Sequence, residues 1–361
     1  MDEKALGPIE KSLTPRARIR GWLRDLLRYS RPREPPPPRG NHIDRGVYGA
    51  AQPLLGLRLI LSDWEVAREA MTPVLWMVAV CIAYAMLIAD AEPFTLSLGS
   101  WKHAFHASWL LRLRQFYFAF GVLAAWPPVL FANHYARFAA MVRFRLGFGT
   151  FGPREMPLLK SAVRVKLQAI VVAVALAPLF FLVKRFPFGG TMAAALLALW
   201  TLHWVVVEAF DDANVLQPGQ TLADVEREAD TLRRPWFVRL FRWFEQEAPA
   251  RPRLLKRLLR MFASSVDRLS KPWREEIALL EANPRLSIGF SLATAALLAT
   301  PLLNLLFRPV IIAGATHLLG HIEHEEHSEL PEALAHDEAH AHQTQEKPLG
   351  ERLPDLGRRF R

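Results

Sequence analysis

The chain has 361 residues, of which 51% are hydrophobic and 22% charged, and its net charge is +10. Its mean hydropathy is only +0.10, a combination that arises when long apolar blocks alternate with charged segments. In a soluble protein such a charge suggests nucleic-acid binding, but beside apolar blocks it indicates cytoplasmic segments that face anionic lipid. A lipid bilayer, and no nucleic acid, is therefore the expected partner. The single cysteine, Cys81, excludes an internal disulfide and a Cys-based zinc site.

Residues 1–45 form a basic, proline-rich segment ahead of the apolar sequence. They contain nine arginines and no apolar core of the length that a secretory signal peptide needs. Three leucines within Leu23–Leu27 are spaced for a short amphipathic basic helix on the membrane surface, and a solvated basic tail accounts for them too. Pro35–Pro38 predicts a stiff polyproline linker, so structured sequence is expected to begin near Gly46.

Five uncharged stretches approach or exceed the ~20 residues that a transmembrane helix needs. They cover residues 70–89, 115–136, 167–183, 186–207 and 286–307. A sixth stretch, 309–322, is too short to span a bilayer unaided. Because a charge at the centre of a membrane helix costs roughly 2.5–3.5 kcal/mol, these runs predict membrane helices rather than the core of a soluble protein.

The distribution of lysine and arginine predicts the orientation. The flank up to residue 69 carries 13 of them, 90–114 carries three, 137–166 carries seven and 208–285 carries fourteen. Positively charged loops face the cytoplasm. We therefore expect a multi-pass protein of the cytoplasmic (inner) membrane, with its N-terminus, 137–166 and 208–285 all on the cytoplasmic side.

The loop 208–285 is predicted to be basic and amphipathic. Apolar and aromatic residues recur at helical spacing within 236–244 and again within 254–262, among arginines and lysines. Such helices lie at the bilayer interface. Packing of an ordinary cytoplasmic helical hairpin predicts the same pattern, and both interpretations stay open.

Two prolines, Pro301 and Pro309, interrupt the last pair of apolar stretches. Proline removes a backbone hydrogen bond and disfavours helix in the preceding residue. Broken helices at membrane depth are tolerated where they face protein or a water-filled cavity. We therefore expect 286–300 and 302–319 to form a re-entrant hairpin with both ends cytoplasmic. A fifth complete passage, which places the C-terminal tail outside, is the alternative.

Polar groups beside these membrane segments are candidate functional residues. Asn304 and Arg308 lie in the interruption, and ionisable residues at membrane depth are functional candidates by default. Both are predicted to contribute to substrate binding, although an arginine that snorkels to the interface is the alternative for Arg308. Glu208, Asp211 and Asp212 close the fourth apolar segment, where a cytoplasmic cap is favoured over an ion site.

Motifs for catalysis, nucleotides and metals are missing from the sequence or incomplete. There is no P-loop and no G-x-S-x-G elbow. The histidine-rich tail, 321–361, is expected to be disordered, and His324–His327 falls one residue short of H-E-x-x-H. His317 and His321 have the spacing of a helical metal pair, but a solvated low-complexity tail is favoured. We predict no enzymatic activity, no catalytic residue, no cofactor and no metal site.

Gly56-Leu57-Arg58 precedes the first membrane segment and is the main candidate for substrate binding. Glycine leaves its backbone N–H open to an anion, and arginine presents a planar fork that suits a tetrahedral oxyanion. A helix start nearby would add N–H donors and a favourable dipole. Anchoring of Arg58 to lipid phosphates, or pairing with Asp63 or Glu65, accounts for the same residues.

At these residues the sequence resembles the CysZ-type membrane proteins, which share a superfamily with the eukaryotic etoposide-induced membrane protein. The similarity covers roughly residues 46–320. It is carried at its two ends by Gly46, Gly56-Leu57-Arg58, Pro73, Pro301-Leu302-Leu303-Asn304, Pro309 and Gly314-Ala315-Thr316.

The resemblance implies an all-α integral membrane protein, with long transmembrane helices and a re-entrant, half-penetrating C-terminal hairpin, assembled as a homo-oligomer. It implies transport of a small oxyanion, sulfate, with Gly56, Leu57 and Arg58 at the binding site. The lack of a nucleotide motif makes such transport passive or ion-coupled. The basic N-terminus, the histidine-rich tail and Arg308, at an expected neutral position, depart from the pattern. A non-transporting membrane scaffold, acting through its tails and amphipathic loop, is the alternative function.

Overall fold

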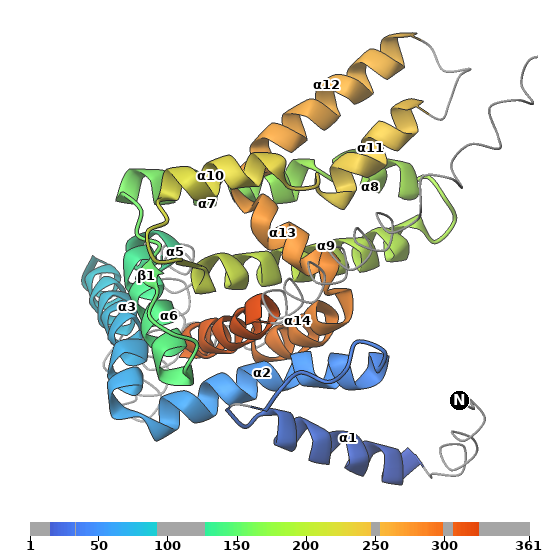
Figure 1. Ribbon diagram of the computed structural model, residues 1–361. Coiled ribbons are helices and arrows are strands. Elements are labelled where there is room, and N and C mark those ends of the chain that lie inside the picture. Colours follow the sequence, from blue (N-terminus) through green and yellow to red (C-terminus); the bar gives the residue numbers. More distant parts are fainter. Residues whose placement is uncertain (1–14, 33, 92–126, 247–252, 299–305, 325–361) are drawn as a thin grey trace, which may run out of the picture. The chain divides into compact units, whose positions relative to one another are not determined.

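A computed structural model of the chain describes residues 15–32, 34–91, 127–246, 253–298 and 306–324. Helices make up most of these residues (Figure 1), as predicted for an all-α protein. One pair of two-residue strands, β1 (Gly152–Pro153) and β2 (Val215–Leu216), runs antiparallel. The described residues up to Leu318 belong to one compact unit, within which all the contacts discussed here lie.

Three helical segments among the described residues are long and apolar enough to cross a membrane: Trp64–Tyr84, Leu158–Phe181 and Gly189–Ala213. They confirm long apolar helices at three of the places where membrane helices are predicted, around 70–89, 167–183 and 186–207. The helices concerned are α3 (Trp64–Ala91), α7 (Leu158–Val174) followed by α8 (Ala177–Val183), and α9 (Gly189–Ala213). Only 17% of the apolar window of the second segment is buried, so most of its side chains are free to face lipid.

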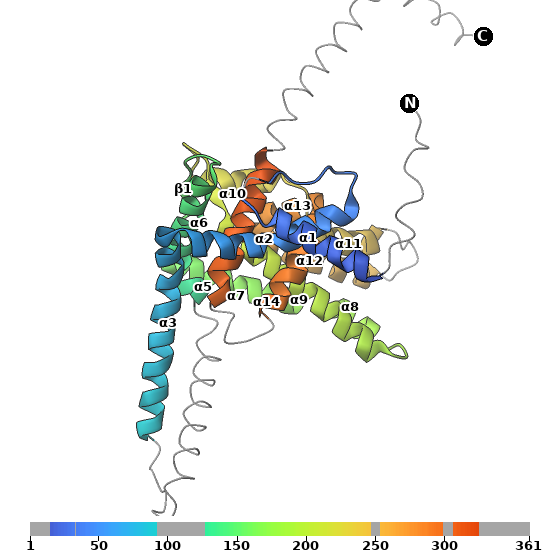
Figure 2. The same ribbon diagram turned by 90° about the horizontal axis from the view of Figure 1, so that it is seen from below.

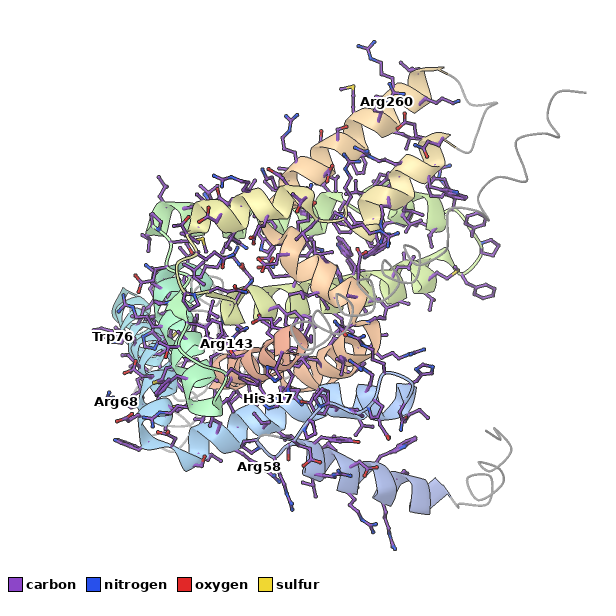
Figure 3. All side chains as sticks on the ribbon, viewed as in Figure 1. Arg58, Arg68, Trp76, Arg143, Arg260 and His317 are labelled. Atoms are coloured by element: carbon purple, nitrogen blue, oxygen red, sulfur yellow. The ribbon has the colours of Figure 1, made fainter. Side chains whose placement is uncertain are left out.

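α3 remains a single helix although Pro73 lies within it (Figure 2). Its apolar face packs through Val74, Met77 and Cys81, which are buried together. Trp76, at 63% exposure, points outward from the same helix (Figure 3). Cys81 is a buried free thiol that packs in this cluster as a small apolar side chain.

The segment predicted as the loop 137–166 is largely helical, which corrects the expected boundaries. α6 (Ala132–Leu146) occupies its first part, and α7 begins at Leu158, before the predicted start at 167. Gly147 ends α6 in the left-handed conformation, with φ of 86°. Arginines and lysines lie on the helices themselves, so their charge was mistaken for a loop signal. Most of the predicted segment 115–136 lies outside the described residues, apart from α5 (Pro127–Leu130) and the start of α6.

Helical structure begins earlier than the predicted start near Gly46. α1 (Pro15–Tyr29) is a basic amphipathic helix, one of the two interpretations of this segment, and it packs on α2 (His42–Ser62). The rings of Tyr29 and Tyr48 meet edge to face with centroids 5.5 Å apart, and the Tyr48 hydroxyl donates to the Glu34 carbonyl at 3.3 Å. Pro35–Pro38 connects the two helices in non-helical conformation, so the tail is partly folded onto the membrane domain.

α2 packs closely on α14 (Pro284–Leu298) because glycines line the contact. A Cβ atom added at Gly49 would lie 2.1 Å from the Leu286 carbonyl oxygen, and one added at Gly289 would lie 1.9 Å from that of Gly46. Small residues let helix backbones approach in this way. The two helices are therefore held by a contact that no larger side chain fits.

The segment 208–285 folds into a series of helices after the end of α9. These are α10 (Leu222–Thr231), α11 (Trp236–Gln246), α12 (Arg253–Ser270), η2 (Lys271–Trp273) and α13 (Arg274–Ala282). α11 and α12 confirm the predicted amphipathic helices and pack on each other, with the rings of Phe241 and Phe262 4.9 Å apart. Leu254 and Leu258 nevertheless remain 70% and 53% exposed, so the packed hairpin keeps an apolar outer stripe.

The re-entrant hairpin stays a prediction. α14 ends at Leu298 and the next described helix covers 306–324, so the turn around Pro301 lies outside the described residues. α14 has 15 residues, or about 22 Å of helix, which is less than the ~30 Å hydrocarbon core.

Candidate functional site

The C-terminal end of α9 places three acids on one face. Glu208, Asp211 and Asp212 stand three and four residues apart, the spacing at which helical side chains are neighbours. Arg308 reaches this face from the 306–324 helix, with its Nη2 atom 2.8 Å from Glu208 Oε1 and 2.6 Å from Asp212 Oδ2. Its guanidinium lies over the ring of Tyr135, 5.4 Å from the centroid. Arg308 therefore faces protein, and its side chain is only 17% exposed.

Two further arginines meet the same acids from the other side. Arg164, on α7, places Nη2 2.5 Å from Asp211 Oδ1 and donates to the Pro272 carbonyl at 2.7 Å. Arg154, just after β1, donates to Glu276 Oε1 on α13 at 2.9 Å. We call these seven residues the charged centre: Arg154, Arg164, Glu208, Asp211, Asp212, Glu276 and Arg308.

Several members of the charged centre are buried, so their charges depend on one another for stabilisation. The side chain of Glu276 is 0% exposed and that of Arg154 is 7% exposed. Burial lowers the pKa of Arg154, but the carboxylates of Glu276, Asp211 and Glu275 outweigh it and raise the pKa overall. Charges without water are stable only with close partners. With three arginines and four acids, the centre also holds one formal negative charge in excess.

A cavity of about 40 Å³ lies within the charged centre, lined by Arg154, Arg164, Asp211, Asp212 and Arg308 among others. This volume is enough for a water molecule or a small ion. Within the described part of the chain, the second carboxylate oxygen of Glu276 and the Nε atom of each of the three arginines have no hydrogen-bond partner. Buried polar atoms are normally paired, so the centre retains unused hydrogen-bonding capacity around a small polar space.

Gly56-Leu57-Arg58 lies in the interior of α2, not beside a helix start as expected. A Cβ atom added at Gly56 would lie 2.2 Å from the Val310 carbonyl oxygen, so Gly56 is packed against the 306–324 helix. The next helix start is at Trp64, where Asp63 accepts from the backbone N–H of Glu65 at 2.9 Å. The prediction that a helix dipole favours anion binding at this motif is therefore wrong.

Arg58 is exposed and points outward from α2 (Figure 3). Its Nη1 atom donates to the Leu27 carbonyl of α1 at 3.4 Å. Asp63 and Glu65, the alternative partners, are paired with Arg145 instead. The anchoring of Arg58 is thus to α1, and its role toward a substrate stays a prediction.

The predicted site residues are connected only through packing. Gly56 contacts the 306–324 helix at Val310, two residues after Arg308. Gly314 completes this contact, because a Cβ atom there would lie 2.5 Å from the Gln52 carbonyl oxygen. Leu57 is half-buried on α2, and Asn304 lies outside the described residues. The Gly56 contact therefore sets the position of the helix that carries Arg308.

The histidines form no metal site among the residues that the structure describes. His317 is buried, with Nδ1 2.6 Å from Gln52 Oε1 on α2 (Figure 3). It therefore belongs to the contact between α2 and the 306–324 helix. The histidines of the tail from position 325 onward lie outside the described residues.

Sequence reasoning identifies four of the seven residues of the charged centre and misses the other three. Arg308 and the three acids of α9 were marked separately, as a substrate residue and as a helix cap. Arg154 and Arg164 were counted as loop charges, and Glu276 lies in an ordinary amphipathic helix. An arginine inside an apolar run needs an acidic partner. This need alone predicts that Arg308 pairs with acids elsewhere in the chain.

The geometry of α9, α7 and the 306–324 helix thus defines a buried ionic site at the end of apolar helices. The CysZ-type resemblance adds expectations for the family and its substrate, which stay proposals. No protein-family model, curated protein or solved structure matches this chain.

Proposed function

We propose that this chain is a multi-pass membrane protein that moves a small oxyanion across the cytoplasmic membrane, with sulfate as the candidate substrate. The observation that carries the proposal is the charged centre, which lies at the end of a helix apolar and long enough to span a bilayer. Ionisable groups at such positions are costly and mark ion pathways and proton relays. The CysZ-type resemblance supplies the oxyanion and the expected homo-oligomer.

The excess acid in the charged centre suits a coupling ion. Arg308 is shared between Glu208 and Asp212. A proton taken up by either carboxylate would leave Arg308 with one anionic partner and a free donor face. Arginine presents parallel N–H groups that match an oxyanion. We therefore propose that proton binding by this acid pair releases Arg308 toward the substrate, so that oxyanion and proton move together.

The remaining predicted substrate residues are assigned supporting roles in this proposal. Gly56 holds the helix that carries Arg308, through the contact at Val310, and Leu57 is proposed to support this arrangement from the next position of α2. Arg58 is the exposed cation of the motif and is proposed to attract the oxyanion at the cytoplasmic side. Asn304, four residues before Arg308 in sequence, is proposed to complete the site.

Counterflow of labelled sulfate into proteoliposomes tests the proposal. Wild-type protein should accumulate sulfate, and a pH gradient should stimulate it. Arg308→Gln should lower the rate about tenfold or more, as loss of a charged hydrogen-bond partner in a polar site costs roughly 1.5–3 kcal/mol. Arg268→Gln, which changes an exposed arginine of α12, is the matched control. Full activity of Arg308→Gln would show that the charged centre does not take part in transport. Wild-type protein without counterflow activity would refute sulfate transport.

A non-transporting membrane scaffold is the second candidate, favoured by exposed apolar stripes on basic helices. On α1, Trp22, Leu23 and Leu27 are each at least 50% exposed, and arginines follow the same helix. A helix of this kind binds the bilayer interface. If the chain is a scaffold, no sulfate counterflow should be measured. Its binding partners should still bind the Arg308→Gln variant but should no longer bind a Leu23→Glu/Leu27→Glu variant.

A further inference from the structure

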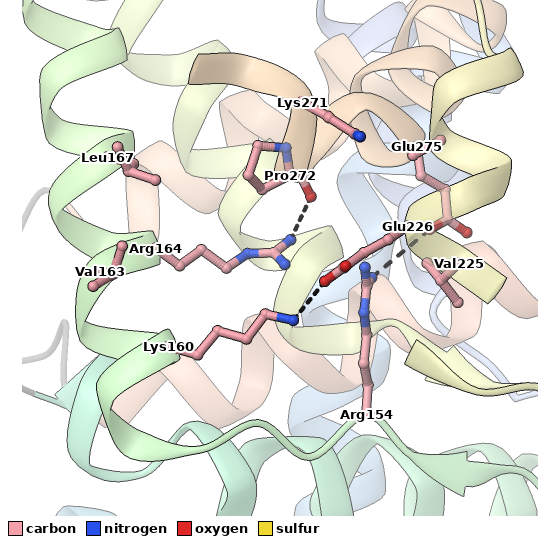
Figure 4. Close-up of a pocket in the computed structure, with 11 residues that line it drawn as sticks. Arg154, Lys160, Val163, Arg164, Leu167, Val225, Glu226, Lys271, Pro272 and Glu275 are labelled. Atoms are coloured by element: carbon pink, nitrogen blue, oxygen red, sulfur yellow. Dashed lines mark hydrogen bonds and ion pairs between the residues drawn. The ribbon is translucent and has the colours of Figure 1, made fainter. Parts of the chain in front are cut away.

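A second cavity, of about 310 Å³, lies where α7, α10 and η2 meet (Figure 4). We call it the lysine cavity, because Lys160 of α7 and Lys271 of η2 border it together with Arg154 and Arg164. Figure 4 shows Lys160, Arg154 and Arg164 directed toward its interior. Two carboxylates, Glu226 and Glu275, line the cavity as well, so an anionic occupant has to compete with these acids for the cations.

The four cations differ in how firmly they are held. Arg154 and Arg164 are paired with buried acids of the charged centre and are 7% and 12% exposed. Lys160 is 48% exposed and its Nζ atom lies 2.5 Å from Glu226 Oε1. Lys271 is 43% exposed and its Nζ atom lies 2.8 Å from Asp230 Oδ1. Exposed pairs of this kind contribute little, so the two lysines can change partners at small cost.

Both acids that hold the lysines come from α10. Glu226 and Asp230 are four residues apart, on neighbouring positions of one helix face. They are 58% and 55% exposed, so both carboxylates can turn to solvent. One phosphate group, with several acceptor oxygens, can then receive both lysines in place of two separate carboxylates, and lysine is a common phosphate ligand.

Apart from two carboxylates, Glu226 and Glu275, the rest of the cavity wall is apolar. Val163 and Leu167 of α7 face Val225 and Ala229 of α10. From Val163, which is 47% exposed, an exposed stripe continues along α7 through Ile170 at 45% and Val174 at 40%. An inorganic anion gains nothing from such a surface, whereas an acyl chain is stabilised by it. Basic pockets between membrane helices on the cytoplasmic side suit anionic lipid headgroups.

We infer that the lysine cavity binds the phosphate of an anionic phospholipid, with Lys160 and Lys271 on the headgroup and an acyl chain along the Val163–Val174 stripe. The inference rests on the membrane placement of α7 in the proposed function, and it does not require transport. A free inorganic phosphate shares the headgroup chemistry, so the experiment must separate the two sources.

Titration of the purified full-length protein in detergent with phosphatidylglycerol, read by native mass spectrometry, tests this site. Phosphatidylglycerol should bind more tightly than phosphatidylcholine. Lys160→Gln/Lys271→Gln should weaken it about 30-fold, or about five-fold for each lysine. Lys166→Gln/Lys184→Gln removes two exposed lysines that do not line the cavity, one on α7 and one just after α8, and should leave the affinity unchanged. An equal loss of phosphatidylglycerol affinity in both double variants would overturn the proposed site, because binding would then depend on overall positive charge and not on these two lysines.

A second variant, which is expected to strengthen lipid binding, keeps the test decisive if the lysine variant fails to fold. Glu226→Gln/Asp230→Asn frees both lysines and should strengthen phosphatidylglycerol binding several-fold. No change in this variant would overturn the assigned headgroup position. Val163→Ser should weaken the lipid alone, while inorganic phosphate should fail to displace it. Displacement by phosphate together with an unaffected Val163→Ser would identify a free-oxyanion site and refute the lipid assignment. Because the titration reports binding alone, failed sulfate counterflow leaves it unaffected.

Discussion

The charged centre and the lysine cavity are made from similar ion pairs but differ in burial. Glu276, which holds Arg154, is 0% exposed, whereas Glu226, which holds Lys160, is 58% exposed. A buried charge has lost its water and depends on its partner, while an exposed charge falls back on solvent when the pair opens. The same chemistry therefore fixes the structure in one place and stays exchangeable in the other.

Two residues belong to both regions, which makes the comparison useful. Arg154 and Arg164 line the small cavity of the charged centre and also the lysine cavity. Their guanidinium groups are held by Glu276 and Asp211, so the buried pairs form a fixed cationic wall for the exposed ones. Variants that separate the two kinds of pair test this division.

The largest effect is expected from Glu276→Gln. This change keeps the size of the side chain but takes from Arg154 its nearest carboxylate, leaving Glu275 at 3.8 Å and Asp211 at 3.9 Å. Removing one partner of a buried pair costs about 3–5 kcal/mol, because the other charge stays buried. The thermal unfolding of the detergent-solubilised protein should fall clearly below that of wild type. Glu226→Gln is the matched control. Equal unfolding temperatures of the two variants would show that the buried and the exposed ion pairs do not differ in their contribution to stability.

A second variant disturbs the charged centre without changing any charge. In Gly56→Ala the new Cβ would lie 2.2 Å from the Val310 carbonyl oxygen and 2.9 Å from the Gly314 nitrogen. Since both neighbours are backbone, the helix that carries Arg308 must shift. Overpacking of this kind costs about 1–3 kcal/mol, and helix propensity offsets up to about 1 kcal/mol of it.

Gly46→Ala is the control for that variant, because its nearest neighbour, the Arg285 carbonyl oxygen, is 4.0 Å away. It should be neutral or slightly stabilising in the same unfolding measurement. Sulfate counterflow should fall in Gly56→Ala and not in Gly46→Ala. Identical behaviour of the two variants would show that the Gly56 contact does not position Arg308.

The apolar runs predicted the membrane helices well because their signal is local. Lipid cannot pair with backbone groups, so a spanning helix must be long and uncharged, and α3, α7 with α8, and α9 met that rule. The bounds were less accurate where charges were satisfied by distant partners. α7 starts at Leu158 because Lys160 and Arg164 find Glu226 and Asp211, which reading α7 alone does not reveal.

The charged centre was harder to predict because its pairs are set by tertiary packing. Arg308 was marked as functional and the acids of α9 as a cap, but their meeting depends on how the 306–324 helix lies on α2. The glycine of Gly56-Leu57-Arg58 was assigned to anion binding, whereas it makes that helix contact. Arg154 and Glu276 carry no local signal of burial, so only the folded arrangement reveals their pair.

The smallest effect is expected from the exposed pair between Lys160 and Glu226. The hydrogen bond from Lys160 lowers the pKa of Glu226, and the charge of the lysine adds to this effect. A carboxyl group with a depressed pKa stabilises the folded protein at neutral pH, and this stabilisation is lost as the pH falls through that pKa. The coupling between the two side chains should therefore weaken both in acid and in high salt.

A double-mutant cycle with Lys160→Met and Glu226→Gln measures that coupling. Chemical or thermal unfolding at neutral pH should give about 0.2–1 kcal/mol, the range of exposed ion pairs. Such a weak pair leaves Lys160 available, and a lipid phosphate can then take it from Glu226. A coupling of several kcal/mol that persists in high salt would contradict this, because Lys160 would then be held as firmly as Arg154. The lysine cavity would in that case be a second fixed ionic site, and phosphatidylglycerol should bind no better after Glu226→Gln than before it.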